Sequence, residues 1–93
     1  MTLEIISPEA KLYSGQVTSV TVPGVDGEFQ MLNHHAAIVS ILTKGDIKIE
    51  AANFVATKEA EGKFFVGADK KQHLSISSGT LEMNDNKIII LVD

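Results

Sequence analysis

Apolar and polar residues alternate along most of the chain with a period of two, which is typical of half-buried β-strands. The segment Val17–Val22 interleaves three valines with serine and threonine, and Ile47–Glu50 alternates isoleucine with lysine and glutamate. No stretch shows the 3.6-residue period of an amphipathic helix. The pattern therefore predicts an all-β fold.

Further strands are predicted where short apolar or alternating runs lie between turn-forming residues. These runs are Leu3–Ile6, Lys11–Tyr13, Glu28–Leu32, Ala36–Leu42, Lys63–Val66, Leu74–Ser77, Leu81–Met83 and Lys87–Val92. The run Ala36–Leu42 is apolar on both of its predicted faces, so we expect it to be a central strand.

Turns are predicted where proline, glycine, asparagine and aspartate interrupt these runs, because such residues break ladders or tolerate left-handed backbone. They are Ser7–Glu9, Ser14–Gly15, Pro23–Gly24, Gly45–Asp46 and Asn84–Asn86. Short strands separated by turns at intervals of roughly 8–12 residues indicate an antiparallel β-sandwich of about ten short strands in two sheets. No helical crossover for a parallel α/β sheet is available.

The segment from Ala51 to Lys71 is less regular. Ala56–Glu61 contains helix-forming residues, but Gly62 and Gly67 flank the short apolar run between them. Glycines in these positions favour short strands joined by turns.

The 93 residues, of which 44% are apolar and 22% charged, are expected to form one globular domain over positions 1–93. A domain of this size hides only about 60–65% of its unfolded surface, so a permanent partner would supplement its stability. The absence of cysteine excludes disulfides and thiolate metal sites.

The net charge of −4 argues against nucleic acid as a partner, because phosphate backbones are bound by clustered basic residues. The one adjacent basic pair, Lys70-Lys71, is expected at a solvated hairpin tip. No segment has the roughly 20 apolar residues of a membrane span, and Met1–Ile6 lacks the basic region of a signal peptide. Membrane contact is therefore expected only through a partner.

Two sets of side chains could carry chemistry. His34, His35 and His73 could ligate a metal, but adjacent strand residues point to opposite faces, and zinc needs three or four convergent ligands. Asp26 and Glu28 could act as paired carboxylates, although a turn around Gly27 more simply makes them a solvated acidic loop. We expect no catalytic residue, no metal and no cofactor.

Several segments together resemble one family over nearly the whole chain. They are Leu3–Glu9, Tyr13–Gly15, Pro23–Phe29, Leu32, His35-Ala36, Leu42–Gly45, Ser78–Met83 and Asn86–Leu91. In this order they resemble the amino-terminal β-sandwich of the epsilon subunit of F-type ATP synthase. The chain departs from the family pattern at Gln30, Asn33-His34, Ala37 and Thr43-Lys44, so His34 has no counterpart in it.

The resemblance implies a non-catalytic rotor subunit of the central stalk that binds the gamma subunit and rests on the membrane c-ring, coupling proton flow to ATP synthesis. It implies a location at the cytoplasmic face of the bacterial inner membrane, or its organellar equivalent. The c-ring-facing loop would comprise Val25, Asp26, Gly27, Glu28, Phe29 and Gln30. The gamma-facing residues would be Ser7, His35 and Ser40.

The family usually continues into two helices that inhibit ATP hydrolysis or bind ATP. Because the sequence stops at Asp93, the resemblance implies neither function for these residues. Two alternatives stay open. One is a stand-alone β-sandwich binding module that presents aromatic residues to a sugar or peptide, and the other is a small metalloenzyme that uses the three histidines.

Overall fold

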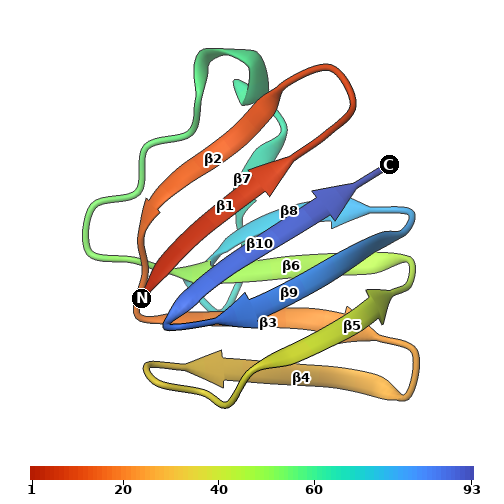
Figure 1. The fold of residues 1–93 in the computed structure, drawn as a ribbon. Coiled ribbons are helices and arrows are strands. Elements are labelled where there is room, and N and C mark those ends of the chain that lie inside the picture. The colour runs from red at the N-terminus through yellow and green to blue at the C-terminus, as the bar shows by residue number, and fades with distance from the viewer.

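The computed structural model describes residues 1–93 and contains ten β-strands and one turn of 3₁₀ helix (Figure 1). In chain order the elements are β1 (Thr2–Ile6), β2 (Lys11–Gln16), β3 (Ser19–Gly24), β4 (Gly27–Leu32), β5 (Ile38–Leu42), β6 (Gly45–Glu50), η1 (Lys58–Ala60), β7 (Phe64–Val66), β8 (Gln72–Ile76), β9 (Gly79–Asn84) and β10 (Lys87–Val92). The predicted all-β fold is confirmed.

The strands form two layers that face each other and are continuous along one edge. The first layer has the order β2-β1-β10-β9-β5, and the second has the order β4-β3-β6-β8-β7. The layers are joined where Gly24 of β3 pairs with Leu42 of β5. The predicted β-sandwich is thus confirmed, and its two layers belong to one continuous ten-stranded sheet that this pairing joins.

All strand pairings are antiparallel except one. The first strand, β1, pairs in parallel with the last, β10, with Thr2 opposite Lys87 and Ile6 opposite Leu91 (Figure 1). This pairing inserts β1 between β2 and β10, so the two ends of the sequence complete the same layer.

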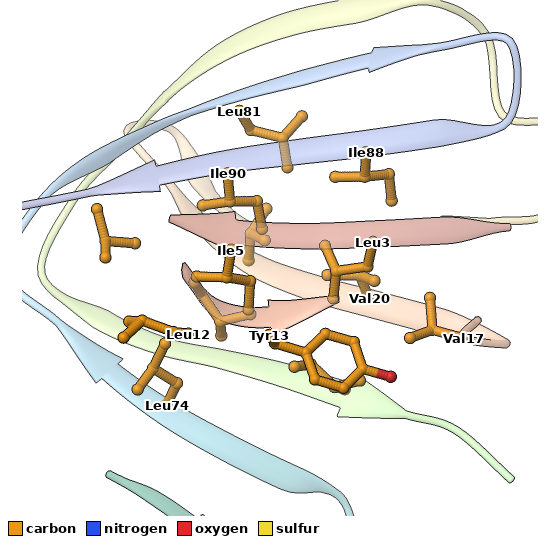
Figure 2. Packing of buried hydrophobic residues seen from close by; sticks show 14 of the residues in the cluster. Leu3, Ile5, Leu12, Tyr13, Val17, Val20, Leu74, Leu81, Ile88 and Ile90 are labelled. Atoms are coloured by element: carbon orange, nitrogen blue, oxygen red, sulfur yellow. The ribbon is translucent and has the colours of Figure 1, made fainter. Parts of the chain in front are cut away.

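The core lies between the layers and consists of one cluster of 20 buried apolar residues. Figure 2 shows Leu3, Ile88 and Ile90 of the first layer and Val20 and Leu74 of the second filling this space. Each fully buried side chain of this size contributes about 1.5–3 kcal/mol relative to an exposed one. Because the period is two, the alternate residues of every strand point outward.

The connection between β6 and β8 covers the open side of the sandwich. Phe54 stacks on Tyr13 of β2 with the ring centroids 4.7 Å apart, and Phe64 of β7 meets both rings edge-on. The hydroxyl of Thr57 donates to the carbonyl of Lys11, 2.6 Å away. The predicted short strand is confirmed as β7, and a helical turn, η1, occupies part of the run that contains helix formers.

Three predicted turns are wrong. Gly15 lies inside β2, and Gly45-Asp46 begin β6, after a bend at Lys44. Gly24 ends β3, so the reversal there falls one step later, at Val25-Asp26. A Cβ on Gly15 would stand 2.7 Å from the hydroxyl of Tyr13, and one on Gly24 would stand 2.8 Å from the ring of Phe29. These glycines make room for aromatic rings rather than for turns.

The predicted turn at Asn84–Asn86 is confirmed. Asp85 and Asn86 have φ values of 50° and 60°, which is the left-handed backbone of a tight hairpin turn. Lys70 lies in the turn between β7 and β8, as expected for a solvated tip.

The run Ala36–Leu42 is predicted to be a central strand, and its strand residues, β5, do lie between β9 and β3 in the strand order. The cover on both faces that this implied is absent. The strand pairs with β9 along its length and with β3 at one residue. Val39 and Ile41 are 78% and 65% exposed. The outward face of β5 therefore has no second layer of protein over it.

Candidate functional site

An apolar strip is exposed on the outward side of the first layer. It consists of Ile6, Val39, Ile41, Ile89 and Leu91, which we call the outer apolar face. The strand register aligns Ile41 with Thr80, Leu91 and Ile6 in one row, and Val39 with Glu82 and Ile89 in the next. Leu91 is 51% exposed, whereas Ile6 and Ile89 are partly covered by their neighbours.

The sequence creates this strip because β10 is apolar at every position from Ile88 to Val92. Ile88, Ile90 and Val92 fill the core, so the two residues between them must face outward. An exposed apolar strip on a sheet that already has a packed core is the usual mark of an interaction surface.

Glu82 lies within the outer apolar face. Its carboxylate forms no ion pair with any residue of the chain. A depression of about 300 Å³ opens beside it, lined by residues of β5, β9 and the segment before β5: Ala37, Ile38, Val39, Met83 and Asn84. The surface can thus receive an apolar side chain next to a negative charge.

The outward side of the second layer is charged instead. Lys48 of β6 lies 2.8 Å from a carboxylate oxygen of Glu28 on β4. This hydrogen bond raises the pKa of the Lys48 ammonium above its ordinary value. Glu28 is therefore already paired within the chain, whereas Asp26 at the hairpin tip has no cationic partner.

A buried histidine is held beside this ion pair. His73 of β8 has Nε2 2.8 Å from Asp69 and Nδ1 3.1 Å from Asp46. The bond to Asp69 and then the bond to Asp46 raise the pKa of the imidazole, and both carboxyl pKa values are lowered by the same contacts. The pairing favours an imidazolium that donates from both nitrogens.

These residues do not form a nucleophilic triad. The hydroxyl of Ser75 donates to Asp46 at 2.9 Å and has no contact with His73. A triad needs the histidine between the hydroxyl and the carboxylate, so that the imidazole can accept the hydroxyl proton. Here the carboxylate occupies the middle position, and both imidazole nitrogens are engaged.

The three histidines do not form one donor set for a metal. His34 and His35 lie exposed in the loop between β4 and β5, while His73 is enclosed by carboxylates on β8. No group of three or more His, Asp or Glu side chains is arranged to hold a metal ion. Tyr13, Phe54 and Phe64 pack against one another, and Phe65, which is 46% exposed, lies against the ring of His73 with the centroids 5.2 Å apart.

The predicted c-ring-facing loop forms the β3–β4 hairpin. Val25, which is 60% exposed, and Asp26 form its tip, and Gly27 follows with a φ of +119°. Phe29 packs against the core, while Gln30 is exposed. The six residues are contiguous, and all of them except Phe29 are exposed.

The predicted gamma-facing residues are not brought together. Ser7 lies in the β1–β2 turn, where its hydroxyl donates to the carbonyl of Ala10, and His35 lies in the loop between β4 and β5. These two connections are at opposite ends of the first layer (Figure 1). Ser40 alternates with Val39 and Ile41, so it faces away from the outer apolar face. It lines a depression with the residues Gly24–Phe29.

Sequence reasoning missed Val39, Ile41, Ile89 and Leu91 as candidate site residues. The available signal was that Ala36–Leu42 and Ile88–Val92 are apolar at more positions than a strand with one buried face requires.

Comparison with known proteins gives consistent matches. The sequence profile of the family described as "ATP synthase, Delta/Epsilon chain, beta-sandwich domain" matches residues 1–93. The chain is 32% identical over 91 residues to the ATP synthase epsilon chain of Helicobacter pylori (strain ATCC 700392 / 26695) and 33% identical over 93 residues to that of Campylobacter curvus (strain 525.92). These alignments cover 98% of this chain but only 61% and 59% of the relatives, so the chain spans about three fifths of their length.

Two solved structures have a similar fold. A chain of the Tetrahymena thermophila mitochondrial ATP synthase, from a structure of its central stalk and c-ring, superposes with a TM-score of 0.73 at 18% identity, covering 98% of this chain and 61% of that one. A chain of the Euglena gracilis mitochondrial ATP synthase, from a structure of OSCP, F1 and c-ring, gives 0.71 at 20% identity, covering 97% and 48%. At these identities the likeness shows the fold alone.

Proposed function

Because the chain belongs to the family of the ATP synthase delta/epsilon chain β-sandwich domain, we propose that it is a non-catalytic rotor subunit in the central stalk of an F-type ATP synthase. It docks the gamma subunit and the membrane c-ring, so that proton flow is coupled to ATP synthesis. The observation that carries this proposal is the outer apolar face, an uncovered surface on a domain whose core is already complete.

The gamma subunit is the partner proposed for the outer apolar face. Val39 and Ile41 are the most exposed of its residues, at 78% and 65%, so covering them removes the most apolar area from water. Apolar residues at the centre of an interface carry most of its energy, and residues at the border contribute less. His35, before β5, and Ser7, after β1, flank this face and are proposed as border contacts.

The β3–β4 hairpin is proposed to face the c-ring. At one end of the first layer, four residues pair side by side across neighbouring strands: Gly24, Leu42, Gly79 and Val92. The tip of the hairpin, at Val25, lies at this same end. Val25 and the unpaired carboxylate of Asp26 are available at its tip, while Glu28 is oriented by Lys48. Because Ser40 lines the depression behind this hairpin, we assign it to the c-ring side rather than to the gamma side.

The subunit is proposed to be peripheral, at the cytoplasmic face of the bacterial inner membrane or the organellar equivalent, and to reach the membrane through its complex. The one helical segment, three residues long, lacks the length and hydrophobicity that a membrane-crossing helix requires. Neither a catalytic role nor nucleic-acid binding forms part of the proposal, because no triad is formed and the net charge is −4.

Co-expression with the cognate gamma subunit tests this function. The two chains are expected to co-elute from size exclusion as a stable 1:1 complex that survives dilution. Complete separation of two folded proteins, each verified by circular dichroism, would contradict the proposal.

A further inference from the structure

We propose that the partner of the outer apolar face carries a basic side chain, best suited as arginine, that pairs with Glu82 in the middle of that face. This inference rests on the proposed docking of the gamma subunit and adds the chemistry of its contact surface.

The position of Glu82 is set by the strand register. It lies directly between Val39 of β5 and Ile89 of β10, with its side chain on the same outward face as theirs. Thr80, two residues earlier on β9, lies between Ile41 and Leu91 in the same way. A partner that covers the apolar residues on both sides of Glu82 therefore also covers its carboxylate.

Glu82 differs from three carboxylates on the outward sides of the two layers; Glu50 of β6 also lacks an ion pair, but it accepts a hydrogen bond from the hydroxyl of Ser19. Glu4 lies 3.6 Å from Lys11, Glu28 lies 2.8 Å from Lys48, and Asp46 lies 3.1 Å from His73. Each of those acids has a cationic partner inside the chain, and Glu82 has none. The charge that compensates Glu82 must come from outside the chain.

Removal of water makes that compensation necessary. An ionised carboxylate loses much more solvation free energy on burial than a neutral polar group, unless a charged donor replaces the water. Arginine fits best, because its planar guanidinium can donate two hydrogen bonds to one carboxylate while its stem and face pack on Val39 and Ile89. The depression lined by Ala37 and Met83 gives the stem room.

A second copy of the chain is a poor occupant of the same face. A symmetric dimer formed through this surface would bring Glu82 close to its own equivalent, in a protein that already carries a net charge of −4. Like charges in a partly desolvated contact repel each other strongly. The face therefore selects a partner with complementary positive charge.

The test compares Glu82→Gln with Glu59→Gln, which removes an exposed acid on η1, outside the face. Affinity for the purified gamma subunit is measured by titration calorimetry at low and high salt, with circular dichroism confirming the fold. We expect Glu82→Gln to weaken binding about tenfold and to reduce the salt dependence, and Glu82→Arg to weaken it about a hundredfold. Glu59→Gln should remain within about twofold of the unmodified chain.

Equal affinity and equal salt dependence for Glu82→Gln and the unmodified chain would overturn this inference while leaving gamma docking intact. Failure of the unmodified chain to bind gamma at all would instead overturn the proposed function. A stable dimer of the chain alone in sedimentation, dissociated by Val39→Asp, would also overturn the inference.

Discussion

His73 and Asp69 form the shortest charged contact of the histidine network, with Nε2 2.8 Å from the carboxylate oxygen. The turn that carries Asp69 is thereby attached to β8, while Asp46 attaches the same ring to β6 at 3.1 Å. A neutral imidazole has one donor, so it can satisfy only one of the two carboxylates. Deprotonation of His73 therefore releases part of this attachment.

The stability of the domain should decrease as pH rises through the raised pKa of His73. Folding raises the pKa of His73. Such a group stabilises the protein fully when the pH is below its pKa in the unfolded chain, and this stabilisation is lost as the pH rises through its pKa in the folded protein. Urea midpoints measured across this range by circular dichroism test the prediction. His73→Gln should flatten the decrease, whereas His35→Gln, an exposed histidine without a carboxylate contact, should preserve it.

The two carboxylates of the network, Asp46 and Asp69, should make stability depend on pH in the opposite direction. The hydrogen bonds from His73 lower the pKa values of Asp46 and Asp69, so their contribution is present above their unfolded values and is lost as pH falls through the folded ones. Carboxyl chemical shifts in a pH titration should show both groups protonating below their ordinary range. Return of both pKa values to the ordinary range in His73→Gln would support the histidine as the cause, and unchanged values would contradict it.

Two substitutions distinguish the contribution of the core to stability from that of the outer apolar face. Ile90→Ala removes a side chain that is 0% exposed and should cost about 2–5 kcal/mol of unfolding free energy, because a cavity remains. Ile41→Ala removes a side chain that is 65% exposed and should change stability by less than about 0.5 kcal/mol. Chemical denaturation measures both, and a large loss for Ile41→Ala would assign that residue to the core.

Gly24→Ala should destabilise the β3–β4 hairpin. The new Cβ would lie 2.8 Å from the ring of Phe29 and 3.0 Å from the backbone carbonyl of Gly27, so the hairpin must shift. Overpacking of this kind costs about 1–3 kcal/mol. Thermal unfolding gives the magnitude, and amide chemical shifts should locate the change in residues 22–30. If Gly24→Ala were as stable as the unmodified chain, the ring of Phe29 would have moved aside without cost, which would contradict the prediction.

The turn at Asn84–Asn86 was predictable, because its residues favour left-handed backbone without any tertiary contact. The roles of Gly15 and Gly24 were not, because the rings of Tyr13 and Phe29 approach them only in the folded sheet. The contacts of His73 were equally hidden, since Asp46 is 27 residues away along the chain. Tertiary neighbours decide such positions, and spacing along one strand does not reveal them.

The outer apolar face shows a related limit of the sequence pattern. Ile88–Val92 and Ala36–Leu42 are apolar on both sides of a strand, which indicates that both sides are covered. The pattern does not say whether a second layer of the same chain or a partner provides the cover. In this fold the inner side is covered by the chain itself, and Val39 and Ile41 are left exposed.

The most direct measurement is the affinity of the purified chain for its gamma subunit, with Val39→Asp compared against Val66→Asp by titration calorimetry. Val66 is a matched control, because it is 63% exposed on β7, outside the outer apolar face. We predict that Val39→Asp weakens binding about 30-fold or more and that Val66→Asp leaves it within about twofold. Equal affinities for the two folded variants would contradict docking through the outer apolar face.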